Sequence, residues 1–248
     1  MVPRSLKDAR RILNRVGWFI PPYAQMQFIY RLCDLIDRKP DFNQTMLQAE
    51  LAQLYTPWNL AAMVAERYPI TPQLLDYKTI IAESVEAHVL GLHHIAFSGL
   101  APVIEGAGRA LAAQRGLTPI SMKDVFTQLA DDCKTEVIAR NYGAVDEVIE
   151  MLDSFREFAK SIFYRSSSDY PLDDNTNRHG ALHGTFSDSH YGEPINFYKT
   201  IASIDFLCFI SAIRGNLSCL SPDPTTRSHA LANYYAACHR LGAARPTC

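Results

Sequence analysis

Three residues suited to acid–base and phosphate chemistry fall within six positions of the sequence: Arg178, His179 and His183. On a helical turn, positions 179 and 183 share one face, and position 178 lies beside it. A histidine with a pKa near neutrality takes or gives a proton at physiological pH. An arginine guanidinium binds a phosphate through two parallel hydrogen bonds. This combination is suited to cleavage of an RNA phosphodiester by its own 2′-hydroxyl group, a reaction that needs no metal ion.

These residues belong to a polar segment, positions 174–192, which is rich in Asn, Arg, His, Gly, Ser and Asp. Apolar helical patterns precede and follow the segment, so we expect it to lie on a surface whose position those helices fix. Functional residues favour such junctions between loops and helices on a rigid scaffold. The segment is therefore the chemically distinctive part of the chain.

The run Arg178-His179-Gly180-Ala181-Leu182-His183 resembles the R-x4-6-H signature of the HEPN superfamily. The wider run from Asn177 to Gly184, followed by Tyr191-Gly192, resembles the NRHxxLHG…YG pattern of a branch of uncharacterised bacterial HEPN-like proteins. Upstream, Ile104-Glu105-Gly106 resembles an element of the same branch. The resemblance extends from about Glu83 to Ile213, and the 178–184 block is its specific part.

The resemblance implies an all-α helical bundle that forms a homodimer and brings two such motifs together at the interface. Many members of the superfamily are metal-independent endoribonucleases that act in defence or toxin systems. By position, His183 would be the general acid and base, and Arg178 would bind the phosphate. His179 would be a supporting polar group in the same site.

Three further residues are candidates for binding: Asn177, Glu105 and Tyr191. Glu105 would orient one of the catalytic side chains. An aromatic ring such as that of Tyr191 stacks on an unpaired base in single-strand sites, and packing in or beside the core is its alternative role. Some family members bind nucleotides or only hold a partner protein. A non-catalytic helical nucleotide- or protein-binding module is therefore the alternative function.

Histidine pairs in the sequence also raise the question of a metal site. His179 and His183 have the spacing of a zinc motif, but Gly180 stands where a metalloprotease needs glutamate. His88, His93 and His94 lie on one predicted helix, and spacings of five and six do not place them on one face. A metal-dependent helical hydrolase built on that cluster is the weakest of three hypotheses. We predict no metal and no cofactor.

Composition limits the partners of the chain. Its 248 residues are 48% hydrophobic and 20% charged, with a net charge of -2. Proteins that grip many phosphates usually have a basic excess, so we expect RNA or a nucleotide to be bound locally or by an oligomer, and we expect no DNA partner. The N-terminal residues lack the apolar run of a signal peptide, so a cytoplasmic location with reduced cysteines is predicted. The longest apolar stretch, Ile201–Ile213, is interrupted by Asp205 and predicts a buried core helix without membrane insertion.

Helical periodicity recurs along the chain and strand signals are scarce, which predicts an all-α fold. A proline-rich stop signal at residues 68–72 divides an N-terminal helical extension, residues 1–70, from a HEPN-like helical bundle, residues 71–248. Thr56-Pro57 and Ser121 with Asp124 are helix-start signals, and Gly242 is a stop signal. The predicted helices cover residues 23–37, 41–55, 57–68, 73–94, 100–114, 121–140, 145–163, 194–213 and 226–241.

Overall fold

The computed structural model describes residues 5–176, 180, 187–188, 191–215 and 217–246. Regular structure within these residues is helical and includes no strand, so the predicted all-α fold is confirmed. Short π-helical turns at Met63–Arg67 and Ala159–Phe163 continue two of the helices. The α-helices are α1 (Leu6–Arg15), α2 (Met26–Arg38), α3 (Gln44–Leu54), α4 (Pro57–Ala62), α5 (Lys78–Val89), α6 (His93–Gln114), α7 (Met122–Arg140), α8 (Val145–Phe158), α10 (Pro194–Arg214) and α11 (Thr226–Ala243).

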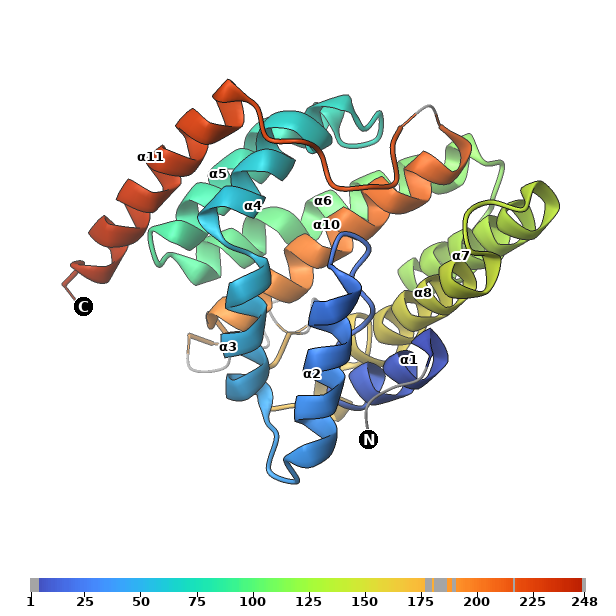
Figure 1. The fold of residues 1–248 in the computed structure, drawn as a ribbon, viewed down its shortest axis with the longest axis horizontal. Coiled ribbons are helices and arrows are strands. Elements are labelled where there is room, and N and C mark those ends of the chain that lie inside the picture. The colour runs from blue at the N-terminus through green and yellow to red at the C-terminus, as the bar shows by residue number, and fades with distance from the viewer. Residues whose placement is uncertain (1–4, 177–179, 181–186, 189–190, 216, 247–248) are drawn as a thin grey trace.

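Helix α10 forms the centre of the molecule. Every residue from Ile195 to Ile213 is buried, and helices α3, α6 and α7 pack against it. Figure 1 shows α10, in orange, crossing the middle of the fold with α6 alongside it. Among the described residues, α10 is the one helix that is long and apolar enough to cross a membrane, and its apolar stretch is entirely buried within the protein. The predicted core helix is therefore confirmed.

The remaining helices cover α10 from two sides. On one side α5 and α6 pack together, and α11 lies against α4 and α5. On the other side α8 lies between α1 and α7. One buried hydrophobic cluster runs from Leu6 in α1 to Cys238 in α11. The division at residue 70 stays a prediction, and residues on both sides of it contribute to this cluster.

Helix-start signals found in the sequence work as predicted. The Thr56 hydroxyl accepts a hydrogen bond from the backbone N–H of Asn59 at 3.2 Å, and Pro57 occupies the first turn of α4. At the start of α7, Ser121 and Asp124 form a reciprocal capping box. Each cap satisfies backbone N–H groups that have no partner inside the helix.

The predicted helices 73–94 and 100–114 have the wrong boundary. Helix α5 ends at Val89, and α6 begins at His93. Gly91 lies between them with a φ of +76°, which glycine adopts without steric cost. The predicted helix start at residue 100 therefore falls inside α6, which also contains Pro102. The periodic pattern continues across the break, so periodicity alone did not reveal it.

Gly242 was expected to stop the last helix, but α11 continues to Ala243. A methyl group at position 242 would lie 2.7 Å from the backbone carbon of Leu90. The absence of a side chain therefore lets the end of α11 approach the turn between α5 and α6 closely.

Candidate functional site

The predicted catalytic residues Arg178, His179 and His183, together with Asn177, lie outside the residues that the structure describes. Residues 177–190 form the candidate segment, and its flanks are described, with Asp174–Thr176 before it and Tyr191–Glu193 after it. The described part of the site consists of these flanks and of the helices that hold them.

Asn196 joins the two flanks of the candidate segment. Its side-chain N–H groups donate to the backbone carbonyl of Asp174 at 2.7 Å and to the hydroxyl of Thr176 at 2.8 Å. Its side-chain oxygen accepts from the backbone N–H groups of Gly192 and Glu193, each at 2.9 Å. Asn196 is fully buried in the first turn of α10. One amide group thus fixes the chain before and after the segment to the central helix.

A buried ion pair lies one turn further along α10. The ammonium group of Lys199 donates to Asp174 Oδ2 at 2.8 Å and to the side-chain oxygen of Gln44 at 2.9 Å. Both charged side chains are completely buried. Burial lowers the pKa of Lys199, and the nearby charge of Asp174 opposes that shift.

The carboxylate of Asp174 has further partners close to it in the sequence. Tyr170 donates its hydroxyl proton to Oδ1 at 3.2 Å, and the Thr176 hydroxyl donates to Oδ2. A buried ion pair is costly to break by removing one partner, because the other charge then stays desolvated. Asp174 and Lys199 therefore hold the flank before the candidate segment in one defined arrangement on α10.

Helix α3 also contributes side chains to the support of the candidate segment. The side chain of Gln48 accepts a hydrogen bond from the backbone N–H of Ile195 at 3.0 Å, which satisfies a free donor in the first turn of α10. Gln44, at the start of α3, accepts a hydrogen bond from Lys199. Two successive turns of α3 thus contribute to the support of the candidate segment.

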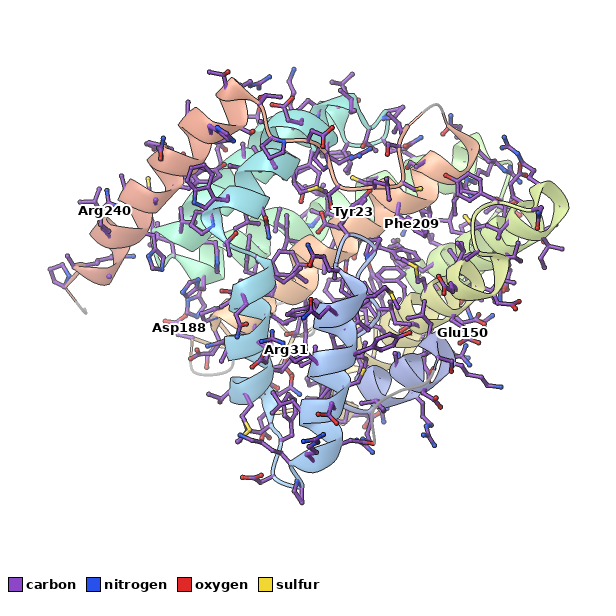
Figure 2. All side chains as sticks on the ribbon, viewed as in Figure 1. Tyr23, Arg31, Glu150, Asp188, Phe209 and Arg240 are labelled. Carbon is purple, nitrogen blue, oxygen red and sulfur yellow. The ribbon has the colours of Figure 1, made fainter. Side chains whose placement is uncertain are left out.

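Tyr191, a predicted binding residue, packs against the start of α6. Its ring meets the His94 ring edge-on, with centroids 4.9 Å apart, and lies 5.8 Å from the Phe97 ring. The Nε2 atom of His94 lies 3.3 Å from the backbone oxygen of Asp188, which is labelled in Figure 2. Tyr191 is half-buried, so part of its ring remains accessible. Whether it stacks on a base stays a prediction.

The sequence predicted one helix for His88, His93 and His94, but the three histidines lie on two helices. His88 belongs to α5, whereas His93 and His94 open α6. The turn at Gly91 brings His88 Nδ1 within 3.2 Å of His93 Nδ1. The His88 ring also stacks on Phe197 of α10, with centroids 3.8 Å apart.

The environment of these rings is apolar. Burial lowers the pKa of His88 well below its usual range, and it lowers the pKa of His93 as well. Within the described part of the chain, no cluster of three or more His, Cys, Asp or Glu side chains could hold a metal ion. The His88–His93 pair connects α5 and α6 to the central helix through Phe197.

Glu105, the third candidate binding residue, lies half-buried in the middle of α6. The next residue, Gly106, lies against the Tyr77 side chain, whose hydroxyl oxygen would be 2.1 Å from an added methyl group. The absence of a side chain at Gly106 therefore lets Tyr77 pack closely against α6. The role of Glu105 in orienting a catalytic group stays a prediction.

Sequence reasoning missed the anchors of the segment, Asn196, Lys199 and Asp174. A signal was present, because Asn196 and Lys199 are three positions apart on one face of a helix that is otherwise strongly apolar. A polar group buried in such a helix needs a partner. Which partner it finds depends on residues 20 or more positions away, and the helical pattern carries no information about that distance.

The two flanks of the candidate segment are held by buried side chains of α10. Comparison of the sequence with protein-family models and with curated proteins gives no match, and comparison with solved structures gives none either.

Proposed function

We propose that this chain is a metal-independent endoribonuclease of the HEPN type, with Arg178 and His183 as its cleavage residues. The observation that carries the proposal is the order Arg178-His179-x-x-x-His183 in the segment that precedes the central helix. The flanks of that run are held by Asn196 of the same helix. The all-α fold agrees with the bundle that the resemblance implies.

The proposed reaction is an internal transesterification. The 2′-oxygen of a ribose attacks the adjacent phosphorus, and the bond from phosphorus to the 5′-oxygen of the next nucleotide breaks. His183 takes the proton of the 2′-hydroxyl, and a proton is returned to the leaving 5′-oxygen. Arg178 binds the non-bridging oxygens, where negative charge develops in the transition state. The products are a 2′,3′-cyclic phosphate end and a 5′-hydroxyl end.

A homodimer is the expected active form, and the proposed biological setting is a bacterial defence or toxin system. Both expectations come from the resemblance. The net charge of -2 means that RNA must be gripped by a local basic patch, which two copies of the segment would supply when brought together. His179 and Asn177 are the proposed supporting residues within that patch.

The test is RNA cleavage in excess EDTA, comparing the intact chain with Arg178→Ala and His183→Ala. We expect the intact chain to cleave and each variant to lose activity by a factor of roughly 100 or more. Gel filtration of each protein shows whether the dimer is retained. Cleavage by Arg178→Ala at the rate of the intact chain would overturn the proposal.

Helix α11 supplies matched controls. His239 and Arg240 are exposed residues of the same chemical types, and Arg240 lies towards the C-terminal end of α11 (Figure 2). His239→Ala and Arg240→Ala should cleave RNA as fast as the intact chain. A loss of activity in these two variants would indicate a general effect of surface charge.

The alternative function is a non-catalytic helical module that binds a nucleotide or a protein. The near-neutral charge favours this function over an extended RNA surface. It predicts an increase in melting temperature with a bound nucleotide such as ATP, and no RNA turnover by any variant.

A further inference from the structure

A cavity of about 490 Å³ lies beside the central helix, away from the anchors of the candidate segment. Its walls come from α2 and the residues before it, from α3 and α4, from α10, and from the chain that leads into α11. The Ser221 side chain donates to the backbone oxygen of Tyr23 at 3.4 Å and so closes one edge. Figure 2 labels Tyr23 at this edge. The volume lies in the range of small-molecule sites.

Asp205 lies in the wall of the cavity on α10. It is 5% exposed, and its Oδ1 atom accepts a hydrogen bond from the Tyr68 hydroxyl at 2.8 Å. Within the described part of the chain, Oδ2 has no hydrogen-bond donor. Asp205 is also the only Asp, Glu, Lys or Arg among the described residues that line the cavity.

The nearest cation, Arg67, does not neutralise this carboxylate by direct contact. Its guanidinium donates to the backbone carbonyls of Ser218, at 2.7 Å, and Leu220. It also lies over the Tyr23 ring, with 5.6 Å between its central carbon and the ring centroid. Arg67 therefore holds the chain that follows α10 and does not line the cavity. The carboxylate of Asp205 thus has no Lys or Arg of the described residues in direct contact with it.

Aromatic rings surround the space next to Asp205. Tyr23, Phe28, Tyr55 and Trp58 all line it, and such rings attract a cation placed over their faces. The Tyr23 hydroxyl is buried, and among the described residues no group hydrogen-bonds to it. Trp58 is 51% exposed and meets the His229 ring edge-on at 5.5 Å, so it stands at the rim.

We propose that this cavity binds a small organic cation, an amine carried on an apolar body, with Asp205 as its counter-ion. An anionic ligand would be repelled by Asp205, and a neutral ligand could donate to Oδ2 but would leave the charge of the carboxylate without a counter-ion. An ammonium group donates to that oxygen and places its charge among the aromatic rings. The proposal is independent of RNA cleavage, because none of its residues belongs to the segment 177–184.

The test uses the full chain and three phenyl probes of matched size: 2-phenylethylamine, 2-phenylethanol and 3-phenylpropionate. Isothermal titration at pH 8 measures each affinity while Asp205 is ionised. We expect the amine to bind at least tenfold more tightly than the alcohol, and the acid to bind weakest. Equal affinities for amine and alcohol, or no binding of the amine at millimolar concentration, would overturn the proposal.

Two variants identify the site. Asp205→Asn should weaken amine binding tenfold or more while affecting the alcohol little. Trp58→Ala changes a half-exposed residue that the core does not need, and it should weaken the amine several-fold even if the Asp205 variant folds poorly. Ile120→Ala, which alters a 95% exposed side chain outside the cavity, is the matched control. Unchanged amine affinity in folded Asp205→Asn or in Trp58→Ala would contradict the assignment.

Discussion

Asn196 uses its whole side-chain amide to hold two stretches of chain that are sixteen or more residues apart (176 and 192). An amide has two N–H donors and an oxygen with two acceptor positions, and here all four are occupied. A buried serine or alanine at this position would satisfy at most part of this set. Asn196 therefore joins the flank before the candidate segment to the flank after it through a single side chain.

Asn196→Ala should destabilise the protein by about 1–3 kcal/mol, because it leaves buried donors and acceptors without partners. If the proposed function is correct, the same change should also slow RNA cleavage, since the flanks lose their common anchor. Urea unfolding followed by circular dichroism measures the first effect. Asn233→Ala, at an exposed position of α11, is the control and should be close to neutral.

Asp205 should make the stability of the protein depend on pH. Burial raises its pKa to about 7 from the usual value of 3.8, while the Tyr68 hydrogen bond and the charge of Arg67 oppose the shift. The folded protein therefore holds a proton on Asp205 between about pH 4 and pH 7, where the unfolded chain has released it. Stability from this group is full below pH 4 and declines as pH rises to about 7.

The size of this effect is on the order of 4 kcal/mol, at 1.36 kcal/mol for each pKa unit. The other groups facing Asp205 are Tyr23, Tyr55, Tyr68, Cys208 and Arg67. Burial raises the pKa values of the three tyrosines and Cys208, so they stay neutral in this range. Denaturant unfolding from pH 4 to pH 8 measures the decline, and Asp205→Asn should remove it. An equal decline in both proteins would assign it to other groups.

Individual residues of the candidate site were predictable only where their chemistry is local. Arg178 and His183 stand out because their types and spacing lie within one short run. Asp205 was seen only as an interruption of an apolar stretch. Its partner Tyr68 is 137 positions away, and its cavity is enclosed by elements from four regions of the chain, so no sequence window contains the site.

The sequence predicted the approximate positions of most helices, and it predicted their ends less accurately. The starts of α4, α7 and α10 follow from local caps and prolines. The break between α5 and α6 lies at Gly91, which has a positive φ, inside a continuing apolar pattern. The glycine was a local turn signal, but the apolar pattern on both sides of it predicted one continuous helix.

Gly192→Ala tests how tightly the start of α6 holds the flank of the segment. Gly192 has a φ of +108°, and an added methyl group would lie 2.1 Å from the His94 ring. We expect the melting temperature to fall by roughly 2–8 °C, from backbone strain and displacement of His94. Thermal unfolding by circular dichroism gives the value.

Gly116→Ala is the matched control, because Gly116 has a φ of +71° and no neighbouring atom within 4 Å of an added methyl group. Its smaller effect measures backbone strain alone. The double variant His94→Ala/Gly192→Ala should recover most of the difference between the two glycine variants. Equal effects at positions 116 and 192 would show that the contact with His94 does not matter.

The molecule as a whole has a core to which its first 70 residues contribute large side chains. Trp18 and Phe19 are fully buried, and the Phe19 ring lies 4.9 Å from the rings of both Phe155 and Phe158. The sequence predicted helices in this region from residue 23 onward, but it predicted neither α1 nor the contacts of these rings with residues far along the chain. The proline signal at 68–72 marks a change of helix, and it cannot indicate whether the two sides share a core.

A chain of residues 71–248 should therefore fail to fold cooperatively, since it would expose the apolar surface that Phe19 and its neighbours cover. Thermal unfolding and gel filtration of this fragment are the measurements. The expected result is a broad transition or aggregation. A sharp transition with a monomeric or dimeric fragment would establish residue 70 as a true domain boundary.

The position of α10 has a consequence for synthesis of the chain on the ribosome. Helices α3, α6 and α7 all pack on α10, yet they are made well before it. At about 5–20 residues per second, residue 194 is added roughly 10–40 s after the first residue. During that time the inner faces of the earlier helices have no permanent partner. The nascent chain therefore exposes these apolar faces until its central helix emerges.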